Sequence, residues 1–226
     1  MPLVPVTESS NSMKSTALKF DQNCRRCPRL VAFVDEVQAK YPDYYAAPVP
    51  PFGDDVPALL VVGLAPGMHG ATATGRPFTG DGSGAMLYET LYKYGFSSAP
   101  ESLSKDDGLQ LFNCTITNAV KCLPPENKPV VAEVKACSAY LLGELLALNS
   151  GSVVVALGAI AHSAVLRAMG VKLAAYKFSH GGEHELPGGV TMIDSYHCSR
   201  YNTQTKRLTE SMFQAIFARV KEKIAS

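Results

Sequence analysis

Continuous apolar runs alternate with amphipathic stretches along most of this chain. The runs at residues 58–64 (ALLVVGL) and 152–157 (SVVVAL) are short and almost wholly apolar, which is typical of strands buried on both faces. The amphipathic stretches carry apolar residues at the three- or four-residue spacing of one helix face. The expected strands are residues 58–64, 111–120, 152–157 and 190–196, and the expected helices are a short one within residues 16–40, then 83–94, 131–148, 159–169 and 208–224.

This alternation predicts an α/β fold in a single domain. Repeated strand–helix units form a parallel sheet with helices on both faces, and 226 residues are enough for one well-buried core. Residues 1–15 are rich in Ser and Pro, so we expect a disordered leader before a domain at residues 16–226. Because ligands bind such sheets at the carboxyl ends of the strands, the loops after the strands are the first candidates for a site.

Charge and composition exclude few functions. The chain has 21 Lys and Arg residues against 20 Asp and Glu residues, and this balance neither favours nor excludes nucleic acid, since a basic strip can lie on a neutral protein. No run approaches the roughly 20 apolar residues that cross a bilayer, so we expect no membrane segment. The N-terminus lacks the basic start and apolar block of a secretory signal, and the expected location is the cytoplasm.

Four of the six cysteines have a spacing that suits metal ligands: Cys24, Cys27, Cys122 and Cys137. Cysteines in a chain without a secretory signal point away from a disulfide framework and toward metal or redox chemistry. The first two form a CxxC motif, and fourteen residues separate the other two. Four such thiolates can bind zinc or an iron–sulfur cluster, and a redox CxxC pair with two buried structural thiols is an equal alternative. Cys114 and Cys198 are expected to be packing residues.

Two glycine-rich loops follow the first expected strand. The segment from Gly63 to Gly67 (GLAPG) is neither a dinucleotide fingerprint nor a P-loop, but its glycines let backbone N–H groups approach a ligand closely. Residues 75–84 (GRPFTGDGSG) hold Phe78, which is suited to stacking on a planar base and could equally be a core anchor. Asp81 in the same loop could cap the helix that follows.

Polar residues also follow the second and fourth expected strands. Asn118 offers a donor and an acceptor side by side, which matches the edge of a nucleobase. His197 could stabilise negative charge on a leaving group, although a lone histidine at a strand end is more often structural. The polar segment at residues 200–207 is either a nucleic-acid contact or a solvated loop with a helix cap. Three further histidines are expected to be structural or exposed: His162, His180 and His184. Of these, His180 could also border the pocket.

In this order and register, five motifs resemble the family 5 uracil-DNA glycosylases, the iron–sulfur branch of that superfamily. They are GLAPG, GRPFTGDGSG, NAVKC, the CxxC…C-x14-C pattern and HCSRYNTQTKRLT, and they run from about residue 20 to the C-terminus. The resemblance implies a three-layer α/β/α sandwich around a four-stranded parallel sheet, with a [4Fe-4S] cluster on the four spaced cysteines. It also implies excision of uracil, and of other deaminated bases such as hypoxanthine and xanthine, to leave an abasic site in DNA.

The resemblance also assigns roles to the loop residues. Phe78 is expected to stack on the extruded base and Asn118 to read its edge, while His197 donates a hydrogen bond to the departing base. Asp81 is expected to position water or stabilise the sugar cation. Backbone groups at Gly63, Ala65 and Gly67 are expected to line the base pocket, and the expected DNA contacts are Arg200, Asn202, Gln204 and Arg207.

The related family 4 enzymes carry an acidic residue after the first glycine of the first motif, where this chain has Leu64 and Ala65. This departure favours family 5 and leaves the water-activating group open. The alternatives are a narrow family 4-like glycosylase, a non-catalytic iron–sulfur protein that binds DNA, and a zinc or redox protein unrelated to DNA. The expected protein is a monomer that acts on double- and single-stranded DNA and is associated with the nucleoid through that DNA.

Overall fold

The structure, a computed structural model, describes residues 16–225, and these residues form a six-stranded sheet in the order β1-β3-β2-β4-β6-β5. The strands are β1 (Phe52–Gly53), β2 (Leu59–Gly63), β3 (Cys114–Asn118), β4 (Val153–Leu157), β5 (Glu183–Leu186) and β6 (Val190–Ser195). The four inner strands are parallel, and β1 and β5 pair antiparallel at the two edges. The predicted four-stranded parallel sheet is therefore confirmed, with one short strand added at each edge. The predicted leader, residues 1–15, lies outside the described residues.

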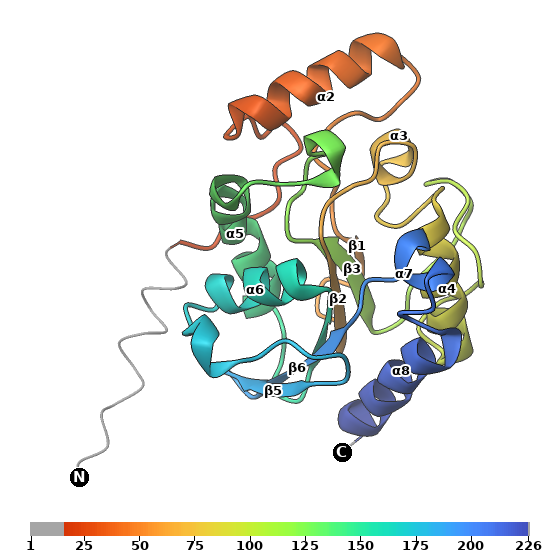
Figure 1. Ribbon diagram of the computed structural model, residues 1–226, viewed down its shortest axis with the longest axis vertical. Helices are drawn as coiled ribbons and strands as arrows, with labels where there is room; N and C mark the ends of the chain where they lie inside the picture. Colours follow the sequence, from red (N-terminus) through yellow and green to blue (C-terminus); the bar gives the residue numbers. More distant parts are fainter. Residues whose placement is uncertain (1–15, 226) are drawn as a thin grey trace.

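Helices cover both faces of this sheet (Figure 1). The α-helices are α2 (Pro28–Lys40), α3 (Ala71–Thr74), α4 (Gly82–Lys93), α5 (Val131–Leu146), α6 (Ala159–Ala168), α7 (Arg200–Gln204) and α8 (Glu210–Ala225), and the short 3-10 helices are η1 (Pro125–Asn127) and η2 (Leu173–Ala175). Residues of α4 and α8 pack in one hydrophobic cluster with the sheet, and residues of α5 and α6 pack in the other. The three-layer α/β/α sandwich is thus confirmed.

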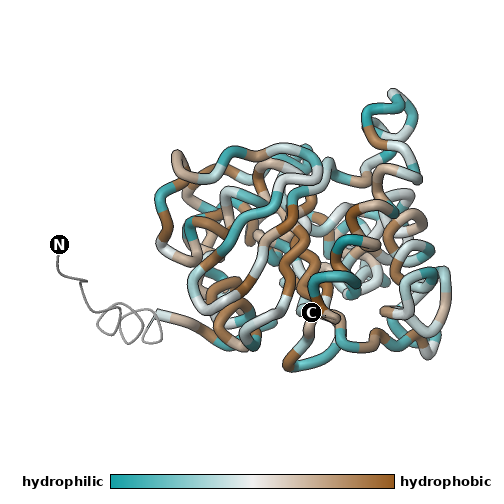
Figure 2. The backbone as a smooth tube through the Cα atoms, turned by 90° about the horizontal axis from the view of Figure 1, so that it is seen from below, coloured by the Kyte–Doolittle hydropathy of each residue, from teal (hydrophilic) through white to brown (hydrophobic). Residues whose placement is uncertain are grey.

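The strands β2, β4 and β6 supply apolar side chains to both clusters. Along β2, Leu59 and Val61 belong to the cluster under α4 and α8, whereas Leu60 and Val62 belong to the cluster under α5 and α6. This alternation explains the continuous apolar sequences of β2 and β4, because both faces of a covered parallel sheet are buried. The hydrophobic segments accordingly gather at the centre of the molecule (Figure 2).

The elements that the pattern did not predict are short or half exposed. β5 has the sequence EHEL and buries only Leu186, so its residues show no apolar run. β1 has two residues and α7 has five, which is too short for periodicity to be detected. Among residues 16–225, no helix is long and apolar enough to cross a membrane.

Candidate functional site

A cavity of about 340 Å³ opens beside the carboxyl ends of β2, β3 and β6. This volume lies within the roughly 300–1,000 Å³ of typical small-ligand pockets. Residues from four separate loops line it: Leu64, Ala65, Gly67, Ala71, Phe78, Asp81, Ser83, Asn118, Asn127, His197 and Ser199. The fold therefore brings together the residues predicted to bind or cleave the substrate, which span more than half of the chain.

Gly63, the last residue of β2, packs against the side chains of Asn118 and Phe78, which line this cavity. It is paired in register with Asn118 on β3. A Cβ atom at Gly63 would lie 2.4 Å from Asn118 Oδ1 and 2.7 Å from the ring of Phe78. Contacts this short do not occur between unstrained atoms, so glycine is the residue that leaves both side chains in their present positions.

Phe78 belongs both to the cavity and to the core. Its ring is 7 % exposed and packs in the cluster under α4, while the ring of His197 is stacked beside it at 6.0 Å between centroids and an interplanar angle of 28°. The backbone of Phe78 has a positive φ of 55°, which is uncommon for an aromatic residue. Its carbonyl oxygen fits against Gly84, where a Cβ would lie only 1.8 Å away. The two predicted roles of Phe78, base platform and core anchor, are compatible.

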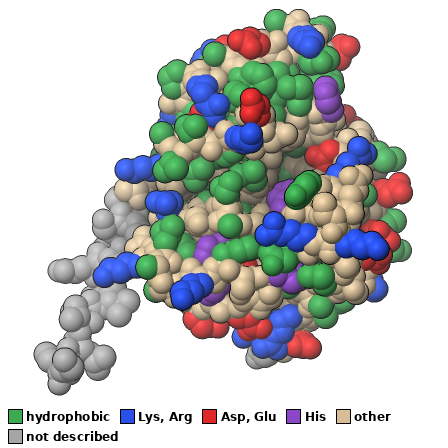
Figure 3. All heavy atoms as spheres, viewed as in Figure 1, with side chains coloured by type: hydrophobic (Ala, Val, Ile, Leu, Met, Phe, Trp, Pro, Cys, Tyr) green, Lys and Arg blue, Asp and Glu red, His purple; other side chains and the backbone are tan. Residues whose placement is uncertain are grey.

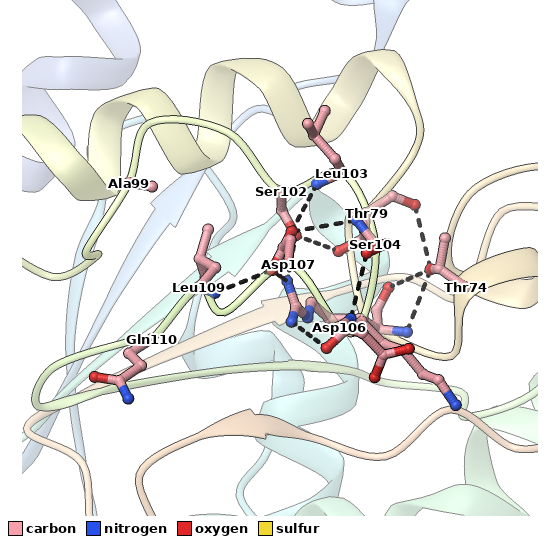
Figure 4. Close-up of polar contacts among 12 residues, drawn as sticks. Thr74, Thr79, Ala99, Ser102, Leu103, Ser104, Asp106, Asp107, Leu109 and Gln110 are labelled. Atoms are coloured by element: carbon pink, nitrogen blue, oxygen red, sulfur yellow. Dashed lines mark hydrogen bonds and ion pairs between the residues drawn. The ribbon is translucent and has the colours of Figure 1, made fainter.

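A salt bridge between the buried Arg76 and the partly exposed Asp107 holds the loop that carries Phe78. Figure 4 shows the hydrogen bonds around Asp107 and Ser102. Arg76 Nη1 donates hydrogen bonds to Asp107 Oδ1 at 2.7 Å and to Ser102 Oγ at 2.9 Å, and the Thr79 and Ser102 hydroxyls are 2.7 Å apart. Burial opposes ionisation of Asp107, but hydrogen bonds from Arg76 and from three backbone N–H groups outweigh it and hold its pKa at about 2. The loop around Phe78 is therefore tied to residues 102–107, which no local sequence pattern indicated.

Asp81 has a structural role as well as a place in the cavity. Its Oδ1 accepts hydrogen bonds from the backbone N–H groups of Ser83 at 2.9 Å and Gly84 at 3.1 Å, which caps the first turn of α4. Its Oδ2 faces Gly67 and Gly70, where added Cβ atoms would lie 3.2 and 2.5 Å from that oxygen. The hydrogen bonds from α4 thus hold Oδ1 in place, and they orient the carboxylate so that Oδ2 points toward Gly67 and Gly70.

Two buried polar atoms of the cavity have no hydrogen-bond partner among the described residues. They are Oδ1 of Asn118 and Nδ1 of His197. A buried polar group without a partner costs about 1–3 kcal/mol, so two of them in one cavity indicate a place where a polar ligand supplies the partners. Burial lowers the pKa of His197 below its ordinary value, and the charge of Asp81 opposes this only in part. The imidazole is therefore neutral at pH 7.

The segment after His197 forms the short helix α7 beside the cavity. Asn202 Nδ2 donates to the carbonyl oxygen of His197 at 2.8 Å, so this side chain is engaged inside the protein. Arg200 lies against the N-terminal end of α4, because a Cβ on Gly82 would lie 2.6 Å from its Nε. Arg207 and Gln204 are exposed, and the Arg207 guanidinium lies 4.8 Å from the centre of the Tyr196 ring. Lys and Arg side chains are visible on this face (Figure 3).

The four spaced cysteines converge on a second, small cavity beside α2 and α5. Cys24, Cys27, Cys122 and Cys137 line it as free thiols. Burial raises the pKa values of three of these thiols, to about 12 for Cys122, and the charges of the neighbouring thiolates raise them further for Cys27 and Cys122. Thiolates crowded in this way repel one another unless a cation lies between them, so the arrangement fits a metal centre. Cys114 and Cys198 lie apart, in the core under α4 and α8.

Comparison with known proteins agrees with this architecture. Residues 50–221 match the family model described as the uracil DNA glycosylase superfamily. The chain is 49 % identical over 203 residues to the type-5 uracil-DNA glycosylase of Thermus thermophilus, which covers 88 % of this chain and 92 % of the relative. It is 44 % identical to the type-5 uracil-DNA glycosylase of Pyrobaculum aerophilum over 87 % of each chain.

The similarity to type-4 proteins is weaker. The type-4 uracil-DNA glycosylase of Archaeoglobus fulgidus is 30 % identical over 74 % of this chain and 79 % of its own length. With a family model that spans most of the domain and type-5 relatives at higher identity and coverage, this chain belongs to the uracil DNA glycosylase superfamily and, within it, to the type-5 family.

Proposed function

We propose that this protein hydrolyses the N-glycosidic bond between uracil and deoxyribose in DNA and leaves an abasic site. The observation that carries the proposal is the convergence of Asn118 Oδ1, His197 Nδ1 and the Phe78 ring on one cavity. The type-5 relatives carry the same activity in their names. Since the glycosidic bond is inaccessible within a duplex, the nucleotide must be extruded into this cavity before it reacts.

Asn118 and Phe78 bind the extruded base. The Phe78 ring supplies a flat surface, and Asn118 supplies a carboxamide whose buried oxygen can accept a hydrogen bond from a ring N–H. Uracil, hypoxanthine and xanthine each present such an N–H beside a carbonyl group. We therefore extend the proposal to hypoxanthine and xanthine, because the same pair of contacts suits all three deaminated bases.

His197 assists departure of the base. Breaking the bond places negative charge on the base, and the N–H group of a neutral imidazole can donate a hydrogen bond to a base oxygen. Removing one preorganised donor of this kind typically costs on the order of 10²–10³ in rate. The lowered pKa of His197 supports this role, because it keeps the ring neutral in the physiological range.

Asp81 is the carboxylate that we propose for the sugar side of the bond. The developing sugar cation and the attacking water both favour a nearby anion. Asp81 is the one carboxylate among the residues that line the cavity, and its capping bonds hold it in a defined orientation. Replacing it with Asn keeps much of the cap and removes the charge, so Asp81→Asn separates the two roles.

We further propose that the four cysteines hold a [4Fe-4S] cluster. Such a cluster joins the segment before α2 to the end of β3 and to α5, and its contribution here is structural. The test is chemical analysis of iron and sulfide together with the visible absorption of the purified protein. A colourless protein that contains zinc at these cysteines would contradict the cluster.

The exposed residues of α7 and the turn after it form the proposed DNA contact. Arg200, Gln204 and Arg207 can bind the phosphate backbone of DNA beside the cavity. Asn202, the fourth residue of the proposed contact, also donates from its amide to the carbonyl oxygen of His197. We propose that the protein acts as a monomer on double- and single-stranded DNA.

The activity test uses purified, cluster-loaded protein and oligonucleotides that carry uracil, hypoxanthine or xanthine. Abasic sites are converted to strand breaks with alkali and counted. We expect breaks at uracil and at both purines, a large loss in His197→Ala, and no loss in His180→Ala, a histidine outside the cavity. Breaks at uracil alone would limit the protein to one base. DNA binding without any break would favour the non-catalytic alternative.

A further inference from the structure

Two histidines and an aspartate meet outside the cavity and outside the cysteine group. They are His162 on α6, His184 on β5 and Asp194 on β6, three elements that lie side by side (Figure 1). His162 Nδ1 is 2.8 Å from Asp194 Oδ1, and His184 Nε2 is 2.9 Å from Asp194 Oδ2. The Asp194 side chain is completely buried, and 12 % of the His184 side chain is exposed.

Both ring nitrogens of His162 face hydrogen-bond acceptors. Its Nε2 is 3.2 Å from the carbonyl oxygen of Tyr176, and its Nδ1 faces the carboxylate of Asp194. Both partners are acceptors, but a neutral imidazole has only one N–H. If Nε2 carries the proton, the lone pair of Nδ1 faces a carboxylate oxygen, and this contact is repulsive unless a second proton or a metal ion lies between them.

We propose that His162, His184 and Asp194 bind a divalent transition-metal ion, with zinc as the best match. Two imidazole nitrogens and a carboxylate oxygen are a common donor set for zinc. The three ligand atoms lie within 4.8 Å of one another. Histidines that bind metals usually donate their other N–H to a backbone carbonyl or a carboxylate, as His162 does to Tyr176.

Two aromatic rings pack against the proposed ligands, and one ligand is partly exposed to solvent. The ring of Phe178 lies edge-on to His162 and the ring of Tyr176 lies edge-on to His184, each at 5.7 Å between centroids. These two half-buried rings cover part of each histidine. His184 is the most exposed of the three ligands, so its side is the open one, where water can complete the coordination.

The metal would join three elements near the catalytic end of the sheet. Asp194 lies three residues before His197 on the same strand and loop. A metal that links Asp194 to α6 and to β5 therefore fixes the end of β6, from which His197 extends. This site shares no residue with the cavity that the four cysteines line beside α2 and α5.

The test is a zinc titration of the cluster-loaded protein, followed by dialysis and metal analysis. We expect one retained zinc per chain. Its X-ray absorption spectrum should show nitrogen and oxygen neighbours at about 2.0–2.1 Å, not the sulfur neighbours at about 2.3 Å that zinc on cysteines gives. Zinc should also raise the Tm in a concentration-dependent way, because a ligand that binds only the folded state stabilises it.

His184→Ala should abolish the retained zinc and the zinc-dependent rise in Tm, whereas His180→Ala, the matched control, should keep both. Retention of zinc by His184→Ala, a spectrum with sulfur neighbours alone, or the absence of retained zinc in the wild-type protein would each overturn the proposal. The wild-type spectrum decides the question even if a variant does not fold.

Discussion

Replacing Gly63 with alanine perturbs the base cavity with a single methyl group. The new Cβ would lie 2.4 Å from Asn118 Oδ1, whereas ordinary contact begins at 3.4 Å, so Asn118 or β2 must move by about 1 Å. A misplacement of about 1 Å in a positioning group costs on the order of 10² in rate. Overpacking of this kind also destabilises the fold by about 1–3 kcal/mol. We therefore expect Gly63→Ala to fold, to melt several degrees lower, and to excise uracil about 100-fold more slowly.

The assay is single-turnover excision from a uracil-containing oligonucleotide, measured well below the Tm of every variant. Val155→Ala is the matched control, because Val155 is completely buried in the neighbouring strand β4 and does not line the cavity. Its truncation costs about 2 kcal/mol, and the excision rate should stay at the wild-type value. An excision rate of Gly63→Ala equal to that of the wild type would show that a methyl group at this position does not displace Asn118. An equal loss of excision rate in Val155→Ala would show that reduced stability alone explains the effect.

Three further predictions concern the supports of the site. Arg76→Ala removes the salt bridge to Asp107 and the hydrogen bond to Ser102, and it should lower stability by about 1–3 kcal/mol. Excision should also slow because the loop that carries Phe78 loosens, and an unchanged Tm would contradict this. Since the folded-state pKa of His197 is lowered, the unfolded chain binds more protons below its own pKa of about 6.5. The free energy of unfolding should therefore fall as the pH drops below that value, and it should fall less in His197→Gln. The excision rate should stay level as the pH falls through 6.5 and should decline only near the lowered pKa of His197. A decline in rate centred at the ordinary histidine pKa would contradict a neutral His197. Cys122→Ser should lower the iron content and the Tm together, and a fully iron-loaded Cys122→Ser protein would remove Cys122 from the ligand set.

The secondary structure and the place of the site could be predicted from the sequence for a local reason. A strand that is buried on both faces is mostly apolar, and a helix that packs on a sheet is apolar on one side, so both leave a recognisable pattern. The helix predicted at residues 83–94 lies at Gly82–Lys93, and the strand predicted at residues 152–157 lies at Val153–Leu157. Once the sheet is parallel, the loops after its strands must meet at one end, which predicts the location of the cavity.

The edge strands and α7 left no such pattern. β5 buries one of its four residues, and its pairing with β6 depends on backbone hydrogen bonds that polar side chains do not reveal. The hydrogen bond from the Asn202 amide to the carbonyl oxygen of His197 depends on how the chain turns after β6, so the sequence did not reveal it. The conformation of such short elements depends on the elements that they pack against and not on a pattern in their own sequence.

The fold class, the order of the elements, the spacing of the four cysteines and the loops after the strands all follow from local patterns in the chain. The partners of the polar side chains depend instead on how distant elements pack. The partner of Arg76 lies 31 residues away, and the group formed by His162, His184 and Asp194 requires three elements to pack side by side. Contacts between residues so distant in the chain leave no periodic pattern, and the charge and pKa of each group depend on them.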